Sequence, residues 1–156
     1  MQLETWTAPP GHPIPNGRFP VLLYRDVDVS DAKGLLAANG WGGSWVNGVF
    51  DFHHFHSTSH EVLAVIAGRA RLELGGPQGE TFEVAAGDVV VLPAGTGHRR
   101  ASASADFRVV GAYPAGQEDY DLLREADDAA RSRIEALDAP PDDPVGGDGV
   151  ARWRVQ

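Results

Sequence analysis

Short apolar runs separated by glycine and proline fill the middle of the chain. Residues 69–74 alternate polar and apolar side chains, which is typical of an antiparallel strand with one face in water. Residues 61–68 are almost continuously apolar and predict a buried strand that a glycine turn closes. Residues 81–85, 88–92 and 106–113 form further short apolar segments bounded by glycine, proline or small residues. Strands of this length and spacing favour an all-β sandwich or barrel.

The pattern differs on the N-terminal side of these strands. Residues 1–20 hold five prolines and are predicted to form a loop-like arm, because proline cannot pair within a central strand. Residues 21–24 predict a short strand. Residues 30–40 predict a short helix, with Ser30 as its N-cap and a left-handed stop at its Asn-Gly end.

The C-terminal part of the chain carries a weaker signal. Residues 119–137 space their apolar side chains as one or two amphipathic helical turns would. Trp153 is expected to pack back on the domain, because an exposed tryptophan is uncommon. The length predicts a single domain over residues 1–156, with a core barrel at about 41–114 and a helical or extended tail over 115–156.

Composition and charge narrow the class of protein. A net charge of −9 argues against a nucleic-acid partner, which would need a basic patch. No apolar run reaches the roughly 18 residues of a membrane span, so no membrane partner is expected. The chain has no cysteine, which excludes disulfides and thiolate ligands. Because the N-terminal residues lack the features of a secretory signal, we expect a cytoplasmic protein.

Three histidines and one glutamate are the candidate metal ligands. His54 and His56 are two residues apart, Glu61 follows after a gap of four, and His98 lies in a later run rich in glycine. Phe50, Phe52, His54 and His56 share one parity, so a strand here would point both imidazoles to one face. Three neutral nitrogens and one carboxylate suit a divalent transition metal with open coordination positions.

The first histidine run resembles a motif of the cupin superfamily. That motif has the form G-x5-H-x-H-x4-E-x6-G. The chain supplies each defined position in order: Gly48, His54, His56, Glu61 and Gly68.

The second run resembles the other cupin motif, which has the form G-x5-P-x-G-x2-H-x3-N. The chain supplies Gly87, Pro93, Gly95 and His98 at the matching positions. Ser102 stands where the family has asparagine. Since that asparagine usually tightens a turn, the departure puts the local loop in doubt rather than the metal.

The resemblance implies a double-stranded β-helix, the jelly-roll barrel of RmlC-like cupins, with the four ligands in its mouth. The wider sequence is similar to small single-domain bacterial cupins described as YjlB-like. That likeness extends over nearly the whole chain and indicates the fold without the activity.

Apolar walls are expected around the metal. They are assigned to Phe50, Phe52, Leu63 and Val65, and Asp51 is expected outside by its opposite parity.

Three larger aromatic side chains leave two alternatives, the wall of a substrate pocket or the core, of which the core is the more common place in a small barrel: Tyr24, Trp45 and Tyr113.

Three other residues near the ligands leave alternatives open. Arg100 shares the parity of His98 and would favour a carboxylate substrate if it lines the pocket, whereas the alternative is a surface arginine. By parity His53 and His60 point away from the site. A bulge at the turn would reverse this for His60 and make it an additional ligand, or a replacement for Glu61.

Taken together, these features predict a mononuclear metal-dependent enzyme, dioxygenase-like, that acts on a small oxygen-rich metabolite. One divalent transition metal per chain is expected, from among Fe, Mn, Ni, Zn, Co and Cu. A non-catalytic small-molecule-binding or sensing cupin is the first alternative, and a metal-dependent isomerase of sugars or keto acids is the second. The resemblance also implies a homodimer. The sequence assigns no residue a catalytic acid or base role.

Overall fold

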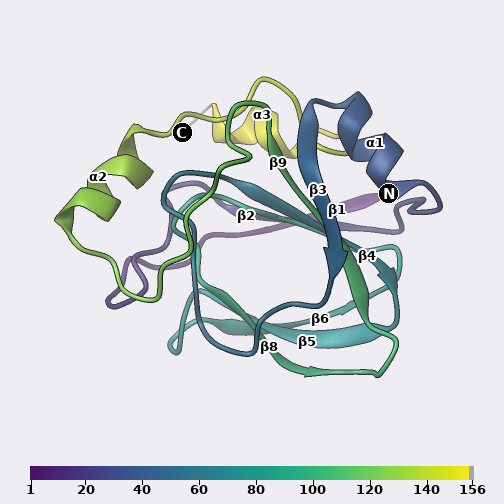
Figure 1. The fold of residues 1–156 in the computed structure, drawn as a ribbon, viewed down its shortest axis with the longest axis horizontal. Helices are drawn as coiled ribbons and strands as arrows, with labels where there is room; N and C mark the ends of the chain where they lie inside the picture. The colour runs from purple at the N-terminus through teal and green to yellow at the C-terminus, as the bar shows by residue number, and fades with distance from the viewer. Residues whose placement is uncertain (155–156) are drawn as a thin grey trace.

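Two antiparallel sheets form the body of the protein, one above the other in Figure 1, in a computed structural model that describes residues 1–154. The larger sheet has the strand order β1-β2-β7-β4-β9-β3. Its strands are β1 (Gln2–Trp6), β2 (Val21–Arg25), β3 (Trp41–Asn47), β4 (Glu61–Ala67), β7 (Val89–Leu92) and β9 (Arg108–Pro114). The smaller sheet has the order β6-β5-β8, from β5 (Arg69–Leu74), β6 (Glu80–Ala85) and β8 (His98–Ala103). The prediction of an all-β jelly-roll fold is confirmed.

The central strands of the larger sheet, β2, β7, β4 and β9, are buried on both faces, which explains why they are almost continuously apolar. In β4, Val62 and Ala64 belong to an outer cluster, whereas Leu63 and Val65 belong to the cluster between the sheets. Burial of each large apolar side chain contributes about 1.5–3 kcal/mol. By contrast β5 alternates exposed and buried residues, because the outer face of its sheet meets water.

Helix α1 (Ala32–Ala38) covers part of the outer face of the larger sheet (Figure 1). Its N-cap is Asp31, whose carboxylate accepts from the Gly34 N–H at 3.2 Å, so the helix begins one residue later than a Ser30 cap would place it. The predicted left-handed stop falls at Gly40, with φ of 81°.

Two further helices follow the strands. In α3 (Gly149–Trp153), Trp153 is buried as predicted, stacks on Phe19 at 5.1 Å and donates to the Pro20 carbonyl at 2.9 Å. Helix α2 (Asp128–Ala136) forms only the second half of the predicted segment and packs on Phe55.

Two expectations about the strands are wrong. The N-terminal arm is not wholly loop-like, because β1 pairs with β2 along all five of its residues at the edge of the sheet, before the first proline of the arm. Residues 48–60 form no regular strand, since their backbone pairs singly, at His54 with His98 and at Phe55 with Leu123. Because neighbouring residues of this segment pair with different parts of the chain, no continuous series of strand hydrogen bonds forms.

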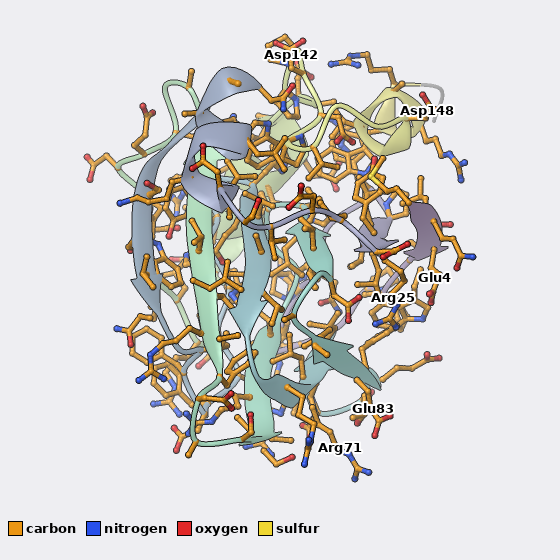
Figure 2. All side chains as sticks on the ribbon, turned by 90° about the vertical axis from the view of Figure 1, so that its right-hand side faces the viewer. Glu4, Arg25, Arg71, Glu83, Asp142 and Asp148 are labelled. Carbon is orange, nitrogen blue, oxygen red and sulfur yellow. The ribbon has the colours of Figure 1, made fainter. Side chains whose placement is uncertain are left out.

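Glu4, Arg25, Arg71 and Glu83 lie on the outside of the sheets (Figure 2). Arg25 pairs with Glu4 at 3.0 Å, and Arg71 pairs with Glu83 at 3.2 Å. Such exposed pairs contribute only about 0–1 kcal/mol each, so the fold depends on its apolar clusters. Among the described residues, no helix is long and apolar enough to cross a membrane.

Candidate metal centre

The four predicted ligands come from three parts of the fold. Glu61 begins β4 in the larger sheet, and His98 begins β8 in the smaller one. His54 and His56 lie on the irregular segment between β3 and β4. Reciprocal backbone hydrogen bonds between His54 and His98, of 3.2 and 2.9 Å, hold this segment against β8. The site therefore lies where the two sheets approach each other.

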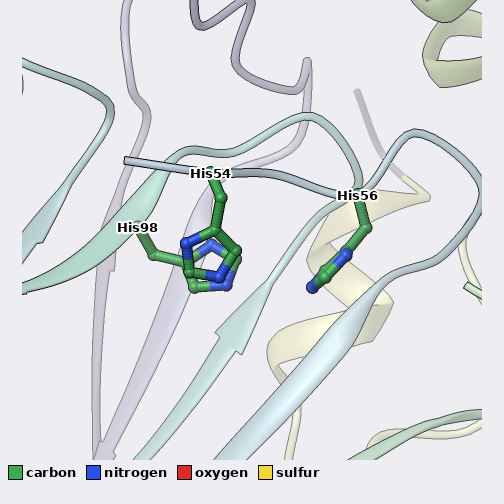
Figure 3. A group of neighbouring side chains, drawn as sticks. All are labelled: His54, His56 and His98. Carbon is green, nitrogen blue, oxygen red and sulfur yellow. The ribbon is translucent and has the colours of Figure 1, made fainter. Parts of the chain in front are cut away.

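The imidazoles of His54, His56 and His98 converge, as Figure 3 shows. One ring nitrogen from each lies within 4.8 Å of the others, and all three side chains are buried. The centroids of the His54 and His98 rings are 4.0 Å apart. Three imidazoles this close together would repel one another if all were protonated, so the arrangement opposes their simultaneous protonation.

Backbone carbonyls fix the tautomer of each ring. The Nδ1 atom of His54 faces the Phe52 carbonyl at 2.9 Å, and that of His98 faces the Thr96 carbonyl at 3.1 Å. The Nδ1 atom of His56 faces the carbonyl of Asp121. Because a carbonyl only accepts, each Nδ1 carries the proton and each Nε2 keeps its lone pair. This is how metal-binding histidines are oriented in proteins.

Glu61 completes the cluster through one carboxylate oxygen. Its Oε1 lies 3.3 Å from His56 Nε2 and 3.2 Å from His98 Nε2. Despite these approaches, this buried oxygen has no well-formed hydrogen bond to any described residue. A buried carboxylate oxygen without a partner is costly, and a cation would remove that cost.

The pKa values of these groups follow their surroundings. Burial, reinforced by the neighbouring His98, lowers the pKa of His54 to about 3. Burial would raise the pKa of Glu61, but the close approach of the His56 and His98 rings lowers it well below its usual range. Burial also acts against protonation of His56, yet the Glu61 carboxylate raises its pKa. Glu61 thus stays ionised beside at least one neutral imidazole at neutral pH.

Tyr113 and Trp45 hold the other side of the glutamate. The Tyr113 hydroxyl donates to Glu61 Oε2 at 2.9 Å and accepts from Trp45 Nε1 at 2.8 Å. Burial and then the charge of Glu61 raise the pKa of Tyr113, so its proton stays on. The Trp45 indole lies over Gly111, where a Cβ would overlap the ring. The glycine therefore allows the tryptophan to reach Tyr113.

The segment after β9 closes one side of the site. The Asp121 carboxylate accepts from the backbone N–H and the hydroxyl of Ser57, at 2.6 and 2.5 Å, while its own carbonyl faces His56. Next to it, Phe55 and Leu123 exchange two backbone hydrogen bonds of 2.9 Å. Asp121 thus couples the tail to the loop that carries the histidines.

A cavity of about 470 Å³ opens from the cluster to the surface. The buried ligands lie in its wall together with Leu63, Trp45 and Tyr113. Phe50 and Arg100 line it too, and Asp51, whose side chain is largely exposed as expected, lies at its edge. This volume is in the range of small-molecule sites.

The other expected wall residues lie elsewhere. Phe52 lines a neighbouring surface pocket, where its ring is 4.4 Å from the Arg124 guanidinium. Val65 is in the core between the sheets. Of the three aromatic side chains with two alternatives, Tyr24 is in the core, in the outer cluster, whereas Trp45 and Tyr113 line the cavity.

His60 points away from Glu61, as its parity indicates. Both of its ring nitrogens are occupied, with Nδ1 accepting from the Ala94 N–H at 2.9 Å and Nε2 facing the Asp138 carbonyl at 2.8 Å. It is therefore not placed to add a ligand. His53 lies outside the cluster, 3.4 Å from Glu73.

Sequence reasoning missed the contribution of the tail to the cavity. Tyr120 and Leu122 line its opening, and Tyr120 stacks on Tyr113 at 4.2 Å. The sequence signal that could have indicated this is the alternation of Tyr120 and Leu122 with Asp121 and Leu123, whose side chains face the protein.

The donor set fits a transition-metal ion. It offers three oriented Nε2 lone pairs and one unpartnered carboxylate oxygen, the nitrogen and oxygen donors that such ions accept.

The barrel and this donor set define a cupin. Residues 45–110 match the family described as Cupin domain. The chain is also 37% identical over 153 residues to "Uncharacterized protein YjlB" of Bacillus subtilis (strain 168), across 94% of this chain and 92% of that protein. The chain therefore belongs to the cupin family, in its YjlB-like branch, as the sequence motifs predict.

Solved structures with a similar fold include three proteins of lower identity. A DUF861 family protein of Thermotoga maritima is 19% identical, with a TM-score of 0.41, over 58% of this chain and 96% of that one. Acireductone dioxygenase of Bacillus anthracis, with a cadmium ion in its active centre, is 16% identical, with a TM-score of 0.42, over 57% of this chain and 60% of that one. An oxalate decarboxylase variant of Bacillus subtilis is 22% identical, with a TM-score of 0.41, over 73% of this chain and 30% of that one. At these identities the likeness concerns the fold alone.

Proposed function

We propose that the protein is a mononuclear metal-dependent enzyme, dioxygenase-like, that acts on a small oxygen-rich metabolite. The observation that carries this proposal is the convergence of the three imidazoles beside Oε1 of Glu61, which lies 3.3 Å from His56 Nε2 and 3.2 Å from His98 Nε2 and has no well-formed hydrogen bond to a described residue. In this proposal His54, His56, His98 and Glu61 hold one divalent ion, which is Fe, Mn, Ni, Zn, Co or Cu.

The bound ion would supply Lewis acidity or, if it is iron, activation of O₂. The protein's own groups have separate tasks. Tyr113 holds the Glu61 carboxylate in one orientation through Oε2. Arg100 offers a positive charge to a substrate carboxylate from the cavity wall. Leu63 and the aromatic walls keep water from the buried end of the cavity.

An open cavity beside the donors favours an enzyme or a ligand-binding protein over a purely structural site. A purely structural or closed binding site would leave no room beside the donors, whereas this cavity of about 470 Å³ reaches the surface. The isomerase alternative needs an acid or base next to the substrate, and Tyr113, which keeps its proton, supports it. A sensing cupin would bind the same ligand without turnover.

The proposal includes a homodimer in the cytoplasm. Light scattering of the purified protein tests its assembly against the 16.6 kDa chain mass. A mass of about twice that value is expected, and a monomer at all concentrations would contradict the dimer.

Oxygen consumption tests the enzyme directly. The metal found in protein from the native host is restored to the metal-free form, and small organic acids are screened with an oxygen electrode. We expect at least one acid to give uptake that His98→Ala abolishes. Tight binding of an acid without any uptake or other product would favour the sensing alternative.

A further inference from the structure

Exposed apolar side chains are concentrated at the opening of the metal-site cavity. Among the described residues, the large hydrophobic side chains that remain exposed are Met1 and four others. Those four are Val46, Phe50, Tyr120 and Leu122, with exposed fractions of 49%, 55%, 38% and 38%, and all of them line this cavity. Apolar residues gathered in this way, rather than scattered over a surface, mark a binding site.

The four side chains come from two sides of the opening. Val46, at the end of β3, and Phe50 precede the histidine run, whereas Tyr120 and Leu122 belong to the tail. On the tail, the side chains between and after them face inward, since Asp121 accepts hydrogen bonds from Ser57 and Leu123 packs beside the Phe55 cluster. The tail is thus fixed with two apolar side chains over the cavity.

The inner end of the same cavity is polar. The donors His54, His56, His98 and Glu61 are buried there. Arg100 also lines the cavity, and its nearest carboxylate is the largely exposed Asp51, at a long 3.9 Å. The cavity therefore has the proposed metal ligands at its inner end, one cationic side chain on its wall and an apolar opening.

We propose that the substrate is an organic acid with an apolar body, in which a carboxylate and an adjacent oxygen face the histidines and an aromatic or branched group lies between Phe50 and Leu122. This inference rests on the proposed metal site and specifies its substrate class. A cavity of about 470 Å³ fits such a molecule. A wholly polar acid would leave the four apolar side chains in water.

Two 2-oxo acids that differ only in the apolar group test the proposal: pyruvate and phenylpyruvate. Their binding to the Zn²⁺-loaded protein is measured by calorimetry, because zinc has no redox chemistry and prevents turnover with O₂. We expect phenylpyruvate to bind at least about tenfold more tightly, as burial of an aromatic group predicts. Phe50→Ala and Leu122→Ala should weaken phenylpyruvate several-fold and leave pyruvate unchanged, whereas Leu35→Ala, outside the cavity, should change neither.

Equal affinities for the two acids, binding of neither acid, or indifference to both cavity substitutions would overturn the proposal. Light scattering on the same proteins tests whether a second copy of the chain, rather than a substrate, covers the four apolar side chains. Loss of a dimer in Leu122→Ala, with ligand affinity unchanged, would make these side chains a subunit interface and overturn the proposal. Zinc content is measured in parallel. Failure of the wild-type protein to retain zinc counts against the proposed metal site, whereas retained zinc with equal affinities counts against the apolar substrate alone.

Discussion

The Tyr113 hydroxyl donates to Oε2 of Glu61 at 2.9 Å, on the carboxylate oxygen opposite the one that faces the imidazoles. This single bond orients the only anionic donor of the cluster. It also leaves Oε1 directed at the Nε2 atoms of His56 and His98. Partners of this kind are known to control metal affinity without touching the metal.

Tyr113→Phe is therefore expected to weaken metal binding by about 10–100-fold. The ring remains and only the donor to Glu61 is lost, so the fold should survive. Competition with a coloured chelator gives the affinity. Trp45→Phe is the matched control, since it removes a donor to the same hydroxyl but keeps the bond to Glu61. Equal losses in both variants, or none in Tyr113→Phe, would contradict this role.

The attachment of the tail gives a second prediction. Asp121→Ala removes the acceptor for Ser57 and Thr58, and hydrogen bonds to a charged group are worth about 1.5–3 kcal/mol each. Because its carboxylate is partly exposed, we expect a total loss of about 1–3 kcal/mol in the free energy of unfolding, measured in urea. Metal affinity should also fall, since the lost carboxylate contacts hold this segment, and with it the backbone carbonyl of Asp121, against His56. Asp119→Ala, on the exposed neighbour, should leave both quantities unchanged, and an equal effect there would contradict the prediction.

Much of the fold could be predicted from the chain because its strands carry clear periodicity. The alternation in β5 and the continuous apolar run of β4 both identified their strands and their burial. Likewise, the buried Trp153 followed from residue type alone. The strand β1 was missed because it is an edge strand with little apolar character beside a proline-rich loop.

The site was only partly predictable, for a related reason. The spacing of the candidate ligands predicted that they lie together, and parity predicted that His60 points away from them. Neither spacing nor parity could place Tyr120 or Leu122, because their position depends on the long-range pairing of Phe55 with Leu123. Nor could it separate Phe50 from Phe52, since the absence of a regular strand over this segment removes the alternation on which that prediction relied.

Acid stability gives a third prediction, through His60. Burial lowers its pKa from 6.5 to about 4, so the folded protein binds fewer protons than the unfolded chain between these values. The stabilisation is present above about pH 6.5 and is lost as pH falls toward 4. It amounts to about 3 kcal/mol in the free energy of unfolding. His60→Gln in the metal-free protein should reduce the slope of this part of the pH profile, measured by urea unfolding, and leave the part that the buried His54 contributes.

The exposed His12 provides the control for this profile. His12→Gln should keep the wild-type slope between pH 6.5 and 4. A slope that persists in full in His60→Gln would show that other groups cause the acid sensitivity.

The central claim is that His54, His56, His98 and Glu61 hold a metal ion. Elemental analysis of protein purified from its native host, beside the His54→Ala/His98→Ala double variant, tests it most directly. Circular dichroism of both samples verifies that the barrel is folded. We predict about one transition-metal ion per chain in the wild-type protein and almost none in the variant. A metal-free wild-type protein, or an equal metal content in the folded variant, would contradict the account.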